Sequence, residues 1–139
     1  MRNSVAKTTH LALGRLVDEL SREHPATTLT IRKPPFEKLP ARVAAVHASH
    51  PLLCSADGML YHLAICNAAK RLGLEIQLCR RGDEMGLAAA ALGVSPDAVE
   101  EFVTGRGRPS GPPWTVEHRR GYAAAIGALA PRVRGLTIA

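Results

Sequence analysis

The sequence predicts a single α/β domain over residues 1–139, built on a small sheet that contains a parallel βαβ unit. Residues 27–32 alternate in polarity and are rich in β-branched side chains, as in a strand with one exposed face. Residues 42–79 run from an apolar segment through an amphipathic segment to a second apolar segment, the order of a strand, a helix and a strand. Helical periodicity dominates after residue 83. The length is ordinary for one domain with its own core.

An N-terminal helix is expected over residues 4–23, because apolar side chains recur there at i, i+3, i+4 and i+7. His24-Pro25 ends it, since the residue before a proline is disfavoured in the α region. The first strand, over residues 27–32, follows and stops at Lys33-Pro34-Pro35. The helix is therefore expected to pack against the sheet that this strand begins.

The predicted βαβ unit uses residues 42–48 as its first strand and residues 74–79 as its second. The first of these is almost continuously apolar, which is typical of a strand covered on both faces. Ser55 or Asp57 is expected to cap the intervening helix, because their oxygens can accept from free amide groups. Gly73 suits the left-handed position that ends such a helix.

The C-terminal part is predicted to be helical over residues 83–92, 96–104 and 115–130. Within it, residues 85–102 resemble the helix-turn-helix of DNA-binding proteins, through Ala89, Gly93, Val99 and Phe102 at the packing positions. The resemblance implies a second helix that enters the major groove. Here that helix carries acidic side chains and no basic ones, which opposes binding to phosphates, so packing of a helix pair explains the pattern as well. The acidic residues of this segment are Asp83, Glu84, Asp97, Glu100 and Glu101.

Charge is unevenly distributed along the chain, whose formal net charge is +6 with fourteen arginines and four lysines. Residues 82–104 carry −5, so the remainder carries +11. A basic body of this kind suits an anionic partner, and arginine forms forked contacts with phosphate. Three cysteines without CxxC spacing indicate reduced thiols in the cytoplasm. No segment has the roughly 20 apolar residues that span a bilayer, so no membrane association is expected.

Polar side chains are predicted to gather where the strands of the βαβ unit end. His47, Ser49 and His50 follow the first strand, and Ser55 and Asp57 begin the helix. Because ligands bind beyond the carboxyl ends of strands in open α/β sheets, we expect a crevice there.

The end of the second strand would add Arg80, Arg81, Asp83 and Glu84 to this crevice. His50 is the expected general base, oriented by Asp57, and Asp83 is a further catalytic candidate. The alternative is that His50 belongs to a loop before Pro51 and that Asp57 only caps the helix.

A zinc site is a different interpretation of the same segment, with His47, His50 and Cys54 as ligands and His62 or Cys66 as the fourth. Structural zinc sites usually have cleaner paired spacing, so no metal ligand is assigned. No cofactor is identified either.

The loop 105–114 is the best evidence for an anionic partner. Gly105-Arg106-Gly107-Arg108-Pro109 resembles the core of an AT-hook, which implies that Arg106 and Arg108 could enter an A·T-rich minor groove. A rigid connector and a lid that brings the arginines to a bound anion are alternatives. In either case Trp114 is expected to anchor the final helix.

Two functions remain open. The first is binding of an anionic ligand, a nucleic acid or a phosphate compound, at the crevice, or phosphoryl or hydrolytic chemistry on it. The second is a non-enzymatic protein–protein adaptor that uses the acidic helix pair 83–104 and the arginine loop 105–114. Whether the protein is an enzyme is left open by the residues alone.

Overall fold

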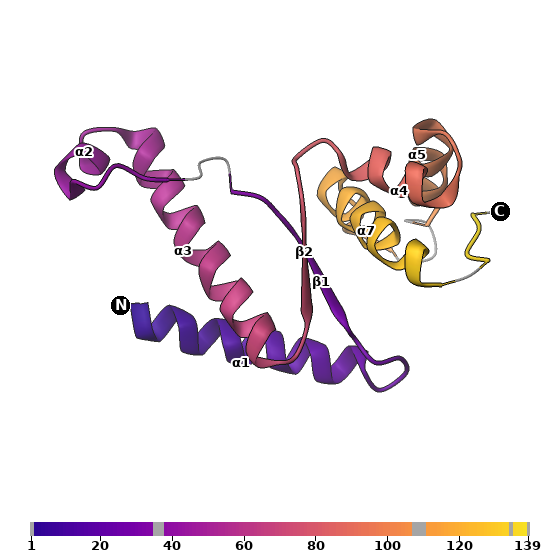
Figure 1. Cartoon of the computed structure of the whole chain (residues 1–139), viewed down its shortest axis with the longest axis horizontal. Helices are drawn as coiled ribbons and strands as arrows, with labels where there is room; N and C mark the ends of the chain where they lie inside the picture. The colour runs from indigo at the N-terminus through magenta and orange to yellow at the C-terminus, as the bar shows by residue number, and fades with distance from the viewer. Residues whose placement is uncertain (1, 35–37, 107–110, 134, 139) are drawn as a thin grey trace. The chain divides into compact units, whose positions relative to one another are not determined.

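The computed structural model describes residues 2–34, 38–106, 111–133 and 135–138. Both strands lie between helices in the part of the chain up to Cys79, and the elements that follow are all helical (Figure 1). In chain order the elements are α1 (Arg2–Leu20), β1 (Thr28–Arg32), α2 (Val43–His47), α3 (His50–Arg71), β2 (Glu75–Cys79), α4 (Glu84–Leu92), α5 (Pro96–Gly105), α7 (Val116–Leu129) and the 3-10 helix η1 (Ala130–Arg132). None of the described helices is long and apolar enough to cross a membrane.

Strands β1 and β2 pair in parallel and form the sheet, which confirms the α/β class. The amide of Glu75 donates to the carbonyl of Thr27 at 2.9 Å. The amide of Lys33 donates to the carbonyl of Cys79 at 2.8 Å. The strands expected at 27–32 and 74–79 are therefore present. The connection between them contains α2 and α3, so the parallel βαβ unit exists, but its first strand is β1.

The strand predicted over residues 42–48 is wrong, because this segment forms the short helix α2. Its apolar residues are not covered on two faces: Val43 is 71% exposed, and of its other residues only Val46 is half-buried. The alanine pair Ala44-Ala45 favours a helix, and a run this short has no periodicity that separates helix from strand.

The cap predicted at Ser55 or Asp57 is also wrong, because α3 begins earlier, at His50. Pro51 lies in the first turn, where its missing N–H costs no hydrogen bond and its fixed φ suits a helix. Ser55 lies inside the helix, and its hydroxyl donates to the carbonyl of Pro51 at 2.7 Å. At the other end Gly73 has φ of 75°, the left-handed conformation expected there.

The chain divides into two compact units, and both strands pass from one to the other. Unit 1 comprises Met1–Leu29 and Pro34–Ile76, and unit 2 comprises Thr30–Lys33 and Gln77–Ala139. Each strand therefore has its first residues in unit 1 and its last residues in unit 2. This division into compact units does not test the prediction of a single domain over residues 1–139, which stays a prediction.

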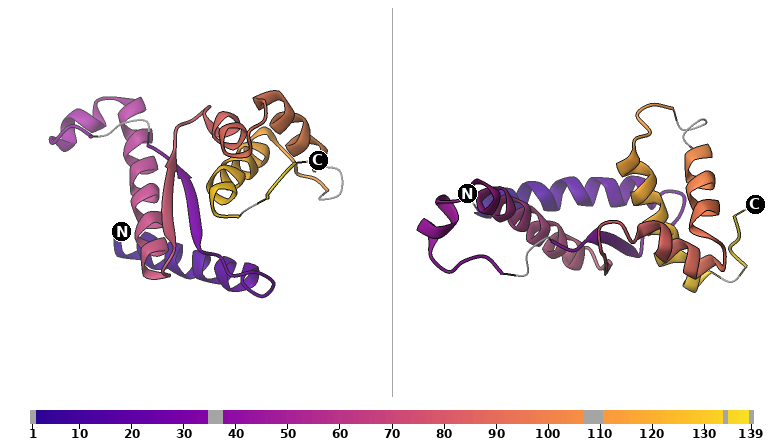
Figure 2. Two further views of the ribbon diagram at one scale, coloured as in Figure 1. Left: turned by 45° about the vertical axis from the view of Figure 1, so that its right-hand side comes forward. Right: turned by 90° about the horizontal axis from the view of Figure 1, so that it is seen from above.

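Unit 1 is built on α1 and α3, which cross near the C-terminal end of α3 (Figure 2). At this crossing Gly14 of α1 faces Leu72, which follows α3. The most buried side chains of the unit are three alanines of α3 and the leucine that precedes β2: Ala64, Ala68, Ala69 and Leu74.

Unit 2 contains the larger core, where α4, α5 and α7 pack together. Its buried apolar side chains are Ala88, Ala89, Val99, Val103, Ala123 and Ile126. The helices predicted over 83–92, 96–104 and 115–130 are thus confirmed, and residues 85–102 form a packed helix pair. Ser95 caps α5 by accepting from the amide of Ala98 at 3.2 Å.

Trp114 anchors the start of α7, as expected. Its indole Nε1 donates to the carbonyl of Val103 at 2.8 Å, and its ring stacks on His118. Further along the same helix, Gly127 allows the backbone of α4 to approach closely: a Cβ at this glycine would lie 3.3 Å from the amide nitrogen of Ala88.

Candidate functional site

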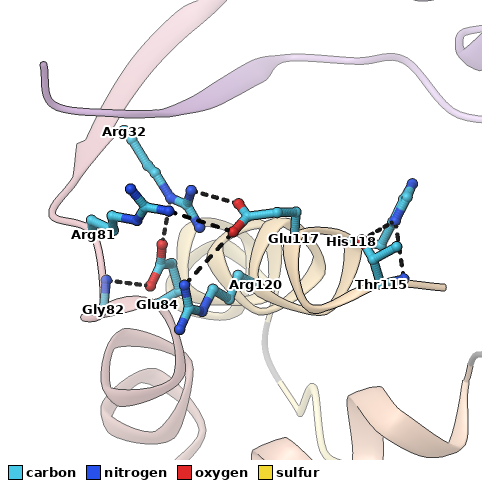
Figure 3. A network of polar contacts seen from close by, with 8 residues as sticks. All are labelled: Arg32, Arg81, Gly82, Glu84, Thr115, Glu117, His118 and Arg120. Atoms are coloured by element: carbon cyan, nitrogen blue, oxygen red, sulfur yellow. Dashed lines mark hydrogen bonds and ion pairs between the residues drawn. The ribbon is translucent and has the colours of Figure 1, made fainter.

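The carboxyl ends of β1 and β2 carry the largest polar network among the described residues of unit 2. Arg32 is the last residue of β1 and Cys79 the last of β2, followed directly by Arg80 and Arg81. The N-terminal turns of α4 and α7 contribute Glu84 and Glu117 to the same place (Figure 3). This is the side of a parallel sheet at which α/β proteins bind ligands.

Glu84 is the buried member of the network, with a side chain only 2% exposed. Its Oε1 accepts from Nε of Arg32 at 2.7 Å, and its Oε2 accepts from the amide of Gly82 at 2.7 Å. Burial alone would raise the pKa of Glu84, but hydrogen bonds from its own amide, Arg32 and Gly82 outweigh it and hold the pKa below its usual value. The carboxylate is therefore charged, and it fixes Arg32 in place.

Glu117 is the exposed member, and three guanidinium groups of the described residues surround it (Figure 3). Nη1 of Arg32 lies 2.6 Å from Oε2, while groups of Arg120 and Arg81 lie 3.7 and 3.9 Å from Oε1. The pKa of Arg32 is raised: burial would lower it, but its two carboxylate partners more than offset that effect. Together these five residues, Arg32, Arg81, Glu84, Glu117 and Arg120, are called the Glu117 site below.

A cavity of about 80 Å³ lies beside this network and is lined by Thr30, Cys79, Gly121 and Ala124 together with Arg32, Glu84, Glu117 and Arg120. A water molecule takes up about 30 Å³ in the liquid, so the space suits two or three waters or one small ion. Burial and the charge of Glu84 raise the pKa of the Cys79 thiol, which is thus neutral rather than a nucleophile.

Of the predicted site residues in unit 2, Arg81 belongs to the Glu117 site and Arg80 lies next to it in the chain. Asp83 is the N-cap residue of α4; its amide donates to the carbonyl of Arg80 at 3.2 Å, and its carbonyl accepts from the amide of Leu87. Arg106 lies over the ring of Phe102, 4.6 Å from its centroid. Arg108 lies outside the described residues.

The predicted residues of unit 1 do not lie at a strand end, because residues 42–48 are helical. His47 ends α2, and Ser49 and His50 begin α3. The neighbour of the His50 imidazole is Cys54, at 3.6 Å between Nε2 and Sγ, and Asp57 is exposed in the second turn of α3. His50 therefore does not follow a strand, which was the reason to expect a general base there. The catalytic roles of His50, Asp57 and Asp83 stay predictions.

Two members of the network, Arg32 and Glu117, are not among the predicted site residues, and the sequence predicts Arg120, with Arg119, only as an extension of the basic patch of the arginine loop. Arg32 could have been found by applying the strand-end rule to residues 27–32 as well as to the later strands. Glu117 lies 85 positions from Arg32, and no local pattern indicates that the two meet.

Within the described ranges, no three His, Cys, Asp or Glu side chains come together as a metal site would require. Comparisons with protein-family models, with curated proteins and with solved structures find no match to this chain.

Proposed function

We propose that unit 2 binds a phosphate-bearing ligand, a nucleic acid or a phosphate compound, at the carboxyl ends of β1 and β2. One observation carries this proposal: the guanidinium groups of Arg32, Arg81 and Arg120 converge on the exposed carboxylate of Glu117. Guanidinium groups arranged around one oxyanion are a common way to hold phosphate. Glu117 then occupies the position that a ligand phosphate takes.

The network is suited to exchange its anion because its two carboxylates differ in burial. Glu84 is buried and holds Arg32 through Nε, so this arginine stays in place when Glu117 moves away. Glu117 is exposed and its contacts with Arg81 and Arg120 are long, and exposed ion pairs of this kind contribute little energy. With two carboxylates and three guanidinium groups the site carries +1, and it carries +2 without Glu117.

The size of the cavity limits what part of the ligand enters it. A volume of about 80 Å³ accepts one phosphate group and leaves a sugar, a base or the rest of a chain outside. Arg80 and Arg81 are exposed, and Arg81 pairs with Glu117, so they would contact neighbouring phosphates of a longer ligand.

The test is to remove the competing carboxylate. Glu117→Gln should tighten binding of a fluorescent oligonucleotide at low salt at least about fivefold, since one charge at 4 Å in water amounts to about 1 kcal/mol. Arg81→Ala should weaken it and flatten its salt dependence. Inorganic pyrophosphate as competitor separates the two ligand sources: displacement of the oligonucleotide by low concentrations indicates a small phosphate compound.

Glu100→Gln is the matched control, because Glu100 also pairs with an arginine of α7, Arg119, at 3.4 Å, but outside the site. It makes the same change in net charge. Equal effects of the two substitutions would show that net charge alone matters, and no oligonucleotide binding at low salt would refute the proposal.

A second function, a protein–protein adaptor, is favoured by the exposed face of α5. Asp97, Glu100 and Glu101 line an open hollow of about 600 Å³ there, with Thr104 and Gly105. Carboxylates on this helix oppose nucleic acid and attract a basic protein surface. The adaptor function requires that Asp97→Asn with Glu101→Gln weakens binding of an arginine-rich peptide.

A further inference from the structure

We propose that α3 carries two separate sites for a thiophilic divalent metal ion such as Zn²⁺, each formed by a histidine and the cysteine four residues later. The pairs are His50 with Cys54 and His62 with Cys66. This inference concerns unit 1 and is independent of the proposed phosphate site in unit 2.

In each pair, the distance between the two donor atoms fits a metal ion that both of them bind. In each pair the imidazole Nε2 lies 3.6 Å from the cysteine Sγ. A tetrahedral zinc ion has Zn–N near 2.05 Å and Zn–S near 2.3 Å, which places its nitrogen and sulfur ligands about 3.5 Å apart. The donor atoms are thus already separated as an ion between them requires.

The helix itself explains why the pairs are formed. Side chains four positions apart lie on the same face of a helix, one turn from each other. Because α3 begins at His50, both members of the first pair belong to this helix. A loop before Pro51, the alternative that the sequence offers for His50, would not place the two residues on one helical face. All three cysteines of the chain are free of disulfides, so both thiols are available as ligands.

The two pairs cannot share one ion. Twelve residues separate them, which corresponds to about 18 Å along a helix axis and about 120° around it. Each ion would therefore have two protein ligands, with water at the remaining positions. This agrees with the finding that no three potential ligands meet within the described residues.

The surroundings of the pairs differ, which predicts different affinities. Cys54 is exposed, and the acidic Asp57 follows it by three residues on the same side of the helix. Cys66 is half-buried, and the basic Lys70 follows it by four residues. A nearby negative charge favours a bound cation and a positive charge opposes it, so the His50–Cys54 site is the tighter one.

The main experiment is a Co²⁺ titration of the reduced protein, followed through the thiolate-to-cobalt charge-transfer absorption, with Zn²⁺ added afterwards to displace the cobalt. The parent protein should bind two equivalents. Cys54→Ser should weaken Co²⁺ binding at the tighter site at least tenfold, Cys66→Ser should do so at the weaker site, and the double variant at both.

Matched controls exist for both ligand types. Cys79 has Glu75 and no histidine four residues before it, so Cys79→Ser should leave two equivalents. His47 has Pro51 four residues after it, so His47→Ala should also leave two, whereas His50→Ala should leave one. Unchanged binding in the double cysteine variant, or no charge-transfer band in the parent, overturns the proposal.

A second measurement needs no variant and is therefore unaffected by misfolding. Zn²⁺ should slow the reaction of a thiol reagent with Cys54 and Cys66 of the parent protein at least tenfold, as peptide mapping would show, while Cys79 keeps its rate. Equal rates with and without Zn²⁺ at both thiols would refute the sites.

Discussion

Unit 1 and unit 2 bury their apolar residues to different extents. In unit 2, Val99 and Val103 of α5 have no exposed surface, and alanines of α4 and α7 close around them. In unit 1 the buried apolar residues are fewer, namely Ala64, Ala68, Ala69 and Leu74, and its two long helices expose Leu11, Leu16, Leu20, Tyr61 and Leu63. Unit 2 also exposes large apolar side chains, so the two units differ in the size of the buried core and not in the number of exposed large residues. A long amphipathic helix thus does not by itself make a core, because a core needs a second apolar surface to meet it.

The polar groups follow the same division. Glu84 is a buried carboxylate, and such a charge is stable inside a protein when it is paired and hydrogen-bonded. Arg32 neutralises its charge, and the amide of Gly82 donates a further hydrogen bond to it. The ionisable side chains of unit 1 whose burial is described lie on the surface or are half-buried, and its histidine–cysteine pairs on α3 are within reach of solvent ions. Substitutions in unit 2 should therefore have larger effects on the free energy of unfolding than those in unit 1.

The largest effect is expected for Glu84→Gln. The amide can still accept a hydrogen bond but cannot neutralise Arg32, whose guanidinium then has the exposed Glu117 as its charged partner. Breaking a buried ion pair on one side costs about 3 kcal/mol, and the partial exposure of Arg32 reduces this to about 2–3 kcal/mol. Urea unfolding would measure it. Glu100→Gln, which breaks an exposed pair, should cost less than about 1 kcal/mol, and equal losses would contradict the role of burial.

The same carboxylate makes stability depend on pH. The pKa of Glu84 is lower in the folded protein than in the unfolded chain, so its charge stabilises the fold at every pH above the unfolded value. This contribution is lost as the pH falls through the folded-state pKa. Unfolding midpoints of the parent should therefore decrease in acid more steeply than those of Glu84→Gln, and parallel curves would exclude the effect.

A smaller effect is expected for Gly127→Ala in α7. The added methyl group would lie 3.3 Å from backbone atoms of Leu87 and Ala88, which cannot move without shifting α4. Overpacking of this kind costs about 1–2 kcal/mol. Gly121 of the same helix is exposed with nothing near its Cβ position, so Gly121→Ala should stabilise by up to about 1 kcal/mol. Thermal unfolding of both variants measures the difference, and the same sign for both would be inconsistent with the close approach.

These contrasts also explain which elements the sequence predicts well. The helices of unit 2 have strong local signals, such as Ser95 before Pro96 and Gly93 in the turn, and the structure confirms them. Strands β1 and β2 were found because alternation and β-branched residues mark them. Residues 42–48 were misassigned since five apolar or small residues fit either conformation, and only their exposure, a tertiary property, decides between the two.

The candidate site was predictable only in part, for a related reason. The strand-end rule found Arg80, Arg81 and Glu84 after β2, because these residues follow a strand in the chain. Applied to the wrong first strand, it added His47 and His50, which lie in another unit. Arg120 meets Glu117 through the i,i+3 spacing of α7, but the approach of Arg32 to Glu117 depends on how α7 packs beside the strand ends, which no local pattern encodes.

The smallest effect is expected in unit 1, for Leu63→Ala in α3. Leu63 is 55% exposed, so truncation removes little buried surface, and alanine has a slightly better helix propensity. The free energy of unfolding should change by less than about 0.5 kcal/mol in urea titrations. Val103→Ala, in a position with no exposed surface, is the reference for a buried aliphatic residue and should cost about 2 kcal/mol. A loss for Leu63→Ala as large as that reference would mean that this side chain is covered in solution, and the contrast between the two units would then disappear.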